Sequence, residues 1–320
     1  MRSRVSLFVV CLIILAAAAT GAAKTVTIGI AQIAEHPALD SARQGFVDRM
    51  KQLGYQEGKQ VIYDMRNAQG DMATAQTIAR KFVGDGVDLI LAIATPTAQA
   101  AANVTSKIPI LITAVTDPQA AGLVRSNQTP GTNVTGTSDL NPVAQQIALV
   151  KSLRPQARRL GVVYNAGETN SVVQVELAKQ VAKEEGLALV EATAGNTSEV
   201  LQAAQSLVGR VDAIYVPTDN TVVSALESVI MVAERAKIPL IAGEGDSVRR
   251  GALATLGLDY YRLGQQTADM AVKVLNGTDP AKMPIQYQQE LRVVVNLRAA
   301  ERMGVTVPQA LIAKADEVIR

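Results

Sequence analysis

Hydroxyl and carboxyl side chains stand directly after apolar runs at several points of this 320-residue chain. The run at 88–94 ends in Thr95-Pro96-Thr97, and the run at 110–115 ends in Thr116-Asp117-Pro118. Short apolar runs between helical segments are typical of parallel strands that are buried on both faces. Thr is a good N-cap and Pro is tolerated in a first turn, so a helix is expected to begin at Thr95. Ligands gather beyond the carboxyl ends of such strands, which makes these loop tips candidates for a binding site.

The same pattern returns about 125 residues later. Val211-Asp212 repeats Val87-Asp88, and Lys237-Ile238-Pro239 repeats Lys107-Ile108-Pro109. The spacing between these landmarks is 20 residues in the first copy and 26 in the second, which predicts one helix lengthened by almost two turns. Such a period is that of a domain, not of a solenoid unit. We therefore predict two similar α/β lobes, lobe one and lobe two; chance similarity of two α/β halves is the alternative.

Two sets of loop tips would face each other across the cleft between these lobes. Asp88 and Asp212 start strands, at the opposite end from the tips, and are expected to be structural. Lobe one offers Gln32, Glu35, His36, Thr95, Thr97, Thr116 and Asp117 as candidate ligand contacts. Lobe two offers Tyr164, Asn165, Asn170, Ser171, Thr218, Asp219, Asn220, Glu244 and Asp246.

The chemistry of these side chains suits a zwitterion such as an amino acid. Hydroxyls at a helix start add donors for a carboxylate, while Asp219, Asp246 or Glu35 could hold an ammonium group. Each residue also has a purely structural interpretation: Thr95, Thr218 and Asp219 as caps, and Asp117 as a turn residue. His36 could be a surface residue and Tyr164 a core residue, so the sequence leaves these alternatives open.

Signals for catalysis are weak. The chain has no GxSxG elbow, no Gly-rich phosphate loop, and a single His, which cannot build a metal cluster alone. Aromatic residues make up 3% and Trp is absent, which weakens a carbohydrate ligand. We expect a binding protein without catalytic activity, cofactor or metal.

The N-terminus predicts export. Arg2 and Arg4 precede an apolar run at 5–19 and small residues at 20–23, as in a signal peptide cleaved after Ala23; a retained membrane anchor is the alternative. Without these residues the chain carries 29 Lys and Arg against 29 Asp and Glu, so neither nucleic acid nor an anionic membrane is indicated as partner. Cys11 lies inside the apolar run, which argues against a lipoprotein.

Several ordered blocks resemble a known family. IGIAQIAEHPALDSARQGF, ILAIATPTAQAAAN, ITAVTDPQAAGLV, YVPTDNTVVSALESV and ATLGLDYYRLGQQTADMA are similar to ABC-transporter substrate-binding proteins of the tryptophan/tyrosine-type (TrpX-like) family. The resemblance covers nearly all of the mature chain. It implies a type I periplasmic-binding-protein fold, with two Rossmann-like lobes of parallel sheet joined by three crossings.

The resemblance also implies a function. A periplasmic monomer would bind an aromatic or branched apolar amino acid in the cleft, close on it, and deliver it to a membrane permease. The alternatives are a receptor that feeds a chemoreceptor or sensor kinase, and a protein that binds a different small metabolite. The family-like positions include Glu35, His36, Thr95, Thr97, Thr116, Asp117, Asn170, Ser171, Thr218, Asp219 and Asn220. We expect residues 24–138 plus 259–290 in lobe one, and 139–258 plus 291–320 in lobe two.

Overall fold

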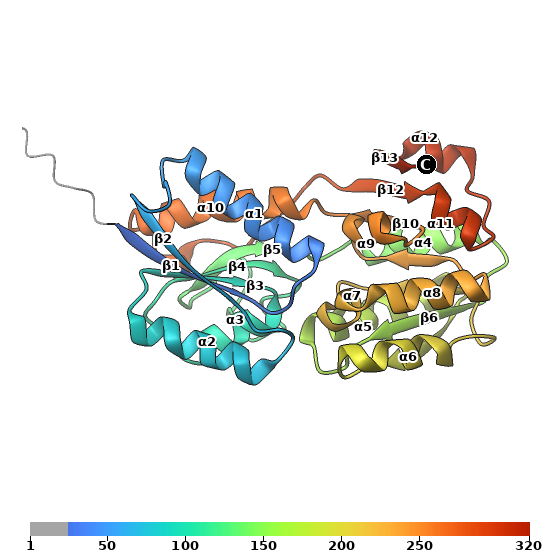
Figure 1. Cartoon of the computed structure of the whole chain (residues 1–320), viewed down its shortest axis with the longest axis horizontal. Helices are drawn as coiled ribbons and strands as arrows, with labels where there is room; N and C mark the ends of the chain where they lie inside the picture. Colours follow the sequence, from blue (N-terminus) through green and yellow to red (C-terminus); the bar gives the residue numbers. More distant parts are fainter. Residues whose placement is uncertain (1–24) are drawn as a thin grey trace, which may run out of the picture.

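The computed structural model describes residues 25–320, which form two α/β lobes lying side by side (Figure 1). Each lobe has one sheet, helices on both faces of it, and a separate hydrophobic core. The predicted signal peptide at 1–23 lies outside the described residues. The prediction of two lobes with parallel sheets is confirmed.

The sheet of lobe one has six strands in the order β11-β5-β4-β3-β1-β2, and all its pairs are parallel. Their side chains are almost entirely buried from β3 to β5, as expected for strands covered on both faces. The strands are β1 (Val26–Gln32), β2 (Val61–Asn67), β3 (Leu89–Ile93), β4 (Ile110–Val115), β5 (Val134–Ser138) and β11 (Gln286–Tyr287).

The sheet of lobe two has seven strands in the order β13-β12-β10-β9-β8-β6-β7, and only the β10–β12 pair is antiparallel. The strands are β6 (Arg159–Tyr164), β7 (Ala188–Thr193), β8 (Ala213–Val216), β9 (Leu240–Ala242), β10 (Ala254–Gly257), β12 (Arg292–Asn296) and β13 (Glu317–Ile319). Strand β13 lies in a segment where the sequence predicts only small helices.

Twelve α-helices connect these strands within residues 25–320. Lobe one contains α1 (Pro37–Gln52), α2 (Met72–Asp85), α3 (Thr95–Ala102) and α10 (Tyr260–Leu275). Lobe two contains α4 (Val143–Leu153), α5 (Thr169–Glu184), α6 (Val200–Ser206), α7 (Asn220–Ser224), α8 (Leu226–Ala236), α9 (Gly245–Arg250), α11 (Leu297–Arg302) and α12 (Gln309–Lys314).

The repeated Val-Asp pairs have a common structural use. Asp88 accepts a hydrogen bond of 2.8 Å from the backbone N–H of Thr27, at the start of the neighbouring strand β1. Asp212 accepts bonds of 2.9 Å from the N–H groups of Arg158 and Arg159, at the start of the neighbouring strand β6. Each carboxylate therefore joins the beginnings of two parallel strands, which supports the structural role expected for both.

The prediction of one lengthened helix in the second copy is wrong. The chain forms α7 and α8 instead, and Ala225 between them has φ −116° and ψ 28°, outside the helical region. The short helix α7 buries Val222 and Val223, while α8 buries an apolar stripe of its own. The two helices pack against different elements, α7 against β6 and α8 against α6, which an apolar pattern alone cannot reveal.

Three crossings connect the lobes. The chain leaves lobe one after β5, returns between β10 and α10, and crosses again between β11 and β12 (Figure 1). The lobe boundaries given above stay a prediction, with which this distribution of strands is compatible.

Helices α1 and α10 cross at very short range because glycines stand at the contact. A Cβ atom at Gly264 would lie 1.9 Å from the carbonyl oxygen of Ala42, and one at Gly45 would lie 2.0 Å from that of Tyr261. The Arg49 guanidinium and the Asp269 carboxylate, 2.9 Å apart, flank this crossing. The contact fixes the start of α10 against α1, and both helix starts border the cleft.

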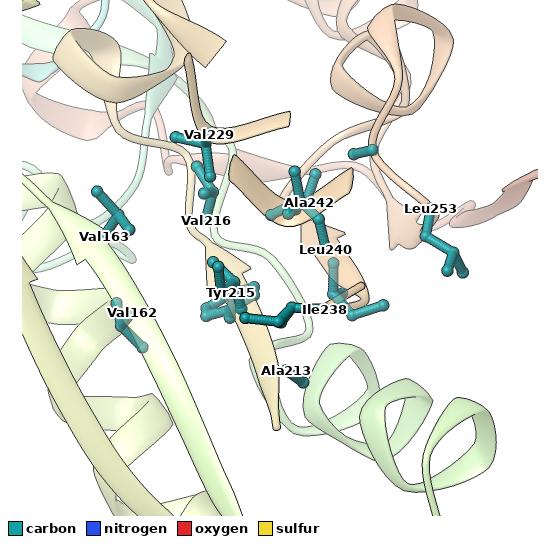
Figure 2. Packing of buried hydrophobic residues seen from close by; sticks show 14 of the residues in the cluster. Val162, Val163, Ala213, Tyr215, Val216, Val229, Ile238, Leu240, Ala242 and Leu253 are labelled. Atoms are coloured by element: carbon teal, nitrogen blue, oxygen red, sulfur yellow. The ribbon is translucent and has the colours of Figure 1, made fainter. Parts of the chain in front are cut away.

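The core of lobe two surrounds Tyr215, which lies among aliphatic side chains of neighbouring strands and helices (Figure 2). Its hydroxyl donates a hydrogen bond of 2.6 Å to the Gln146 side chain. Gln146 in turn donates to the carbonyl oxygens of Gly243 and Leu256, at 3.0 and 2.9 Å. This buried network fixes the ends of β9 and β10, from which a cleft loop begins.

We expect Gly264→Ala to lower the free energy of unfolding by about 1–3 kcal/mol, because the added methyl group must push α1 and α10 apart. Gly84→Ala is the control: Gly84 lies on exposed α2 with open space around its Cβ position, and Ala should stabilise by about 0.5–1 kcal/mol. Urea denaturation of both variants measures the difference. Equal stabilities would contradict the close crossing.

Candidate functional site

A small cavity lies between the lobes, at the carboxyl ends of the strands. Its free volume is about 10 Å³, which is about the room of one water molecule. The side chains that line it are mostly polar although they are buried, and they come from both lobes and from one crossing. They include His36, Thr116, Asp139, Asn170, Thr218, Asp219, Asn220, Glu244 and Tyr260, beside Ala38, Leu39, Ala114 and Val223.

His36 stands directly before α1 and faces this cavity. It is 7% exposed, and neither ring nitrogen has a hydrogen-bond partner of good geometry among residues 25–320. Burial lowers the pKa of His36 to about 4, and the nearby Asn220 side chain offsets only part of this effect. The imidazole is therefore neutral at pH 7, with one nitrogen able to donate and one able to accept.

Four carboxylates lie buried around the cavity. Asp139, Asp219 and Glu244 line it, and Glu168 lies directly behind Asn170 and Asn220. None of the four takes part in an ion pair within residues 25–320. A buried carboxylate without a cationic partner is costly, so hydrogen bonds must compensate for lost solvation.

Asp219 and Glu168 hold the loops of lobe two together. Asp219 accepts from the N–H groups of Asn165 and Val222 at 2.6 and 2.7 Å, and from the Ser171 hydroxyl at 2.6 Å. It is thus the N-cap of α7 and also fixes the start of α5. Burial and the neighbouring charge of Glu168 raise the pKa of Asp219 to about 7.

Glu168 accepts five hydrogen bonds. Backbone N–H groups of Asn220 and Thr221 donate at 3.1 and 3.0 Å, and three side chains donate as well. These three donors are Asn170, Asn220 and Thr221, at 3.0, 2.5 and 2.8 Å.

Asp139 and Glu244 have fewer donors. Asp139 accepts from the hydroxyls of Thr116 at 2.9 Å and Tyr260 at 2.5 Å, and burial raises its pKa. Glu244 caps α9 by accepting from the Ser247 N–H and hydroxyl. Burial, together with the charge of Asp246, raises the pKa of Glu244 to about 7.

Amide groups complete the wall formed by lobe two. Asn170 donates to Glu168 and to the carbonyl oxygen of Thr218, but its Oδ1 atom has no partner among the described residues. The Thr218 hydroxyl accepts from Gln174 at 2.6 Å. Asn170 therefore offers an unused acceptor, while Thr218 is already bonded.

The two threonines at the start of α3 differ from each other. The Thr97 hydroxyl donates to the carbonyl oxygens of Ile93 and Ala94, at 2.7 and 2.9 Å, and so turns back into lobe one. The Thr95 hydroxyl is 99% buried and has no partner within residues 25–320. Only Thr95 keeps a free hydroxyl at this helix start.

Asn165 and Ser171 donate to Asp219 and do not line the inner cavity, and five further predicted contacts lie away from it as well. Gln32 bonds within lobe one to Ala34, Asp40 and Arg43; Asp117 accepts from two N–H groups of its own turn; and the Tyr164 hydroxyl donates to Glu191 on β7. Asp246 pairs with Arg249 at 2.7 Å beside a different hollow. Glu35 is exposed at the entrance.

That entrance is a wider hollow of about 660 Å³ between the lobes, which is a usual size for a small-molecule pocket. Its walls include Ile33, Ala34, Glu35, Met72, Pro96 and Gln99 from lobe one, with Asn165, Asn196, Asn220 and Thr221 from lobe two. Asn220 borders both spaces, so the two lie next to each other.

Sequence reasoning missed Asp139, Glu168 and Tyr260. Asp139 directly follows strand β5, so the rule that picked Thr116 after β4 could have found it. Tyr260 begins α10, and no sequence signal indicates that its hydroxyl reaches Asp139. Among the described residues, no group of three or more His, Cys, Asp or Glu is placed to bind a metal ion.

Residues 27–319 match the family of ABC transporter substrate binding proteins. The chain belongs to this family. It is 45% identical over 301 residues to the tyrosine-binding protein of Clostridioides difficile (strain R20291), covering 93% of this chain and 87% of that relative. Proteins of this family act outside the cytoplasm. Within residues 25–320, no helix has the length and apolarity needed to cross a bilayer.

Two solved structures of similar proteins match this chain to different degrees. An ABC domain from Streptococcus pneumonia in complex with L-Trp is 36% identical, with a TM-score of 0.89 over 92% of this chain and all of that one. A ligand-free, open substrate-binding protein with adhesive properties from Clostridium difficile is 45% identical, yet its TM-score is 0.70 over 92% of this chain and 99% of that one. The predicted type I periplasmic-binding-protein fold is confirmed. The structure of this chain matches the Trp complex more closely than it matches the ligand-free, open structure.

We expect the stability difference between Glu244→Gln and the parent to depend on pH. Because the folded-state pKa of Glu244 is raised to about 7, the folded protein keeps a proton on Glu244 that the unfolded chain loses from about pH 4.5 upward. The stability that the protonated Glu244 provides is therefore lost as the pH rises from about 4.5 through 7. Gln cannot ionise, so the variant should gain up to about 3 kcal/mol over the parent between pH 4.5 and 7.5.

Urea denaturation of both proteins across this range measures the difference. The titration of His36 has the opposite sign, since its pKa is lowered, but it is common to both proteins and cancels. A difference that stays constant with pH would contradict the burial of Glu244.

Proposed function

We propose that this protein binds an aromatic amino acid between its lobes and delivers it to an ABC permease. The observation that carries this proposal is the wall of buried, unmatched polar groups around the inner cavity. His36 and Asn170 hold unpartnered hydrogen-bonding atoms at this cavity, Thr95 holds another at the start of α3, and the carboxylates have no cationic partner within residues 25–320. A zwitterion can bind to both, because its carboxylate accepts hydrogen bonds and its ammonium group pairs with a carboxylate.

Lobe one supplies the donors for the ligand's carboxylate. The first N–H groups of a helix have no partner inside it, and the helix start carries a partial positive charge. Helix α1 begins at the inner cavity beside His36, and α3 begins at the entrance beside Thr95. Both helix starts, the Thr95 hydroxyl and the neutral His36 ring are suited to a carboxylate.

The side chain of the ligand is inferred from relatives and from the entrance hollow. One relative reported above is named a tyrosine-binding protein, and the structure of another was solved in complex with L-Trp. Ile33, Ala34, Met72 and Pro96 give lobe one an apolar wall beside the inner cavity, against which an aromatic ring would pack. The matched family consists of transport proteins, which favours import over the sensing role.

The remaining parts of the proposal are supported by the family's role in transport and by the sequence of residues 1–23. The chain acts as a monomer in the periplasm after removal of residues 1–23, and it serves as a carrier without catalytic activity. Closure of the lobes on the ligand provides the signal that the permease recognises.

We expect L-tyrosine, L-tryptophan or L-phenylalanine to raise the melting temperature of the purified protein. A ligand at 100 times its Kd stabilises by about 2.7 kcal/mol through mass action. A thermal-shift panel of the twenty amino acids, with glucose and ribose as unrelated controls, measures this effect. Stabilisation by a sugar and by no amino acid would overturn the proposed ligand.

We expect Thr95→Val and Thr97→Val to act differently although both remove one buried hydroxyl. Thr97 loses two hydrogen bonds inside lobe one, which should cost about 1 kcal/mol of stability. Thr95 has no internal bond to lose, so its replacement should lower affinity for the amino acid about three- to tenfold and leave stability unchanged. Titration calorimetry and urea denaturation separate the two effects; unchanged affinity in Thr95→Val would exclude this contact.

A further inference from the structure

The inner cavity holds more acidic groups than its own residues pair with cations. Its four buried carboxylates lack an ion-pair partner within residues 25–320, and its one histidine is uncharged at neutral pH. His36 and Asn170, 93% and 96% buried, also present unpartnered polar atoms at the same cavity. These observations point to a ligand with a positive group, and the hydrogen-bond pattern shows which carboxylates remain available for it.

A carboxylate accepts about four hydrogen bonds. Glu168 already accepts five, so it has no capacity left. Asp219 accepts three, from the N–H of Val222 in α7, the N–H of Asn165 after β6 and the Ser171 hydroxyl in α5, so it ties three segments of lobe two together. Both residues therefore fix loops of lobe two and offer little to a ligand.

Asp139 and Glu244 keep free acceptor positions. Both donors to Asp139 are hydroxyls, of Thr116 and Tyr260, which rotate freely to suit a new partner. The donors to Glu244 all lie at the start of its own helix α9, and they are the Ser247 N–H and hydroxyl and the Asp246 N–H. Asp139 lies on the first crossing and Glu244 at the end of β9, so together they join the hinge to lobe two.

We propose that Asp139 and Glu244 form the subsite for the ligand's ammonium group, and that Asp219 is a positioning residue. This inference rests on the proposed function and assigns one end of the ligand. The carboxylate then points to the starts of α1 and α3 in lobe one. The ammonium group contacts the first crossing and lobe two, while the carboxylate contacts lobe one, so the ligand holds the lobes together.

The other acids predicted for this role are placed unfavourably. Asp246 forms an ion pair with Arg249 and lines a hollow at the hinge instead of the inner cavity. Glu35 is exposed at the entrance, where water screens its charge.

The subsite couples binding to proton release. An ammonium group favours the ionised form of a neighbouring carboxyl, so a ligand that binds near pH 6 drives a proton from Glu244 to solvent. Affinity then rises between pH 5.5 and 7.5. The titratable groups that face Glu244 are Asp246 and Arg249 on its own helix, Tyr260 from α10, and, around the cavity, Asp139, Asp219 and His36.

The test is titration calorimetry of the mature protein with L-tryptophan and L-tyrosine at pH 6 and pH 8, in buffers of different ionisation enthalpy. Asp139→Asn and Glu244→Gln keep the shape of each side chain, and their hydroxyl and serine partners accommodate the amides. Each variant should lose at least about tenfold in affinity at pH 8. The parent should release a fraction of a proton per ligand at pH 6, and Glu244→Gln should release less.

Asp279→Asn is the matched control, because Asp279 is a surface cap far from the cleft and Asn caps equally well. It should bind as the parent does. A parent that binds with no proton exchange from pH 5.5 to 7.5, or two folded variants that bind within twofold of the parent, would overturn this subsite and leave the proposed function standing. A parent that binds no amino acid would overturn the proposed function itself.

Discussion

Burial of carboxylates without cations is the constraint on which the site depends. Asp139, Glu168, Asp219 and Glu244 lie between the lobes, where each loses the solvation that keeps an ionised acid stable. Glu168 and Asp219 regain it through hydrogen bonds to loops of lobe two, and those loops become rigid as a result. Hydrogen bonds replace less of the lost solvation at Asp139 and Glu244. These two carboxyl groups therefore make the cavity selective for a ligand that carries a positive charge.

The rest of the fold holds these groups in register. The close crossing of α1 and α10 fixes His36 and Tyr260 relative to each other, while Gln146 fixes the strand ends from which the Glu244 loop departs. Because the inner cavity has a free volume of only about 10 Å³, an amino acid enters only when the lobes part. Binding and closure are therefore one equilibrium, biased by a ligand that contacts both lobes.

Much of this arrangement could be predicted from the sequence, because parallel strands and their loop tips follow from apolar runs and turn residues. The structural role of the repeated Val-Asp pairs and the helix that begins at Thr95 illustrate this. The failures have physical reasons. Ala225 breaks a helix without Gly or Pro, and β13 forms only because β12 is beside it. Side-chain directions, such as Thr97 turning inward while Thr95 stays free, depend on local packing that a pattern of residue types does not specify.

The most direct test of the central claim is a crystal structure of the mature protein grown with L-tryptophan. The account predicts the amino acid between the lobes, with its ammonium nitrogen within hydrogen-bonding distance of the Asp139 and Glu244 carboxylates and its carboxylate at the starts of α1 and α3. An ammonium held by Asp219 alone, or an amino acid held only in the entrance hollow with the inner cavity unchanged, would contradict it.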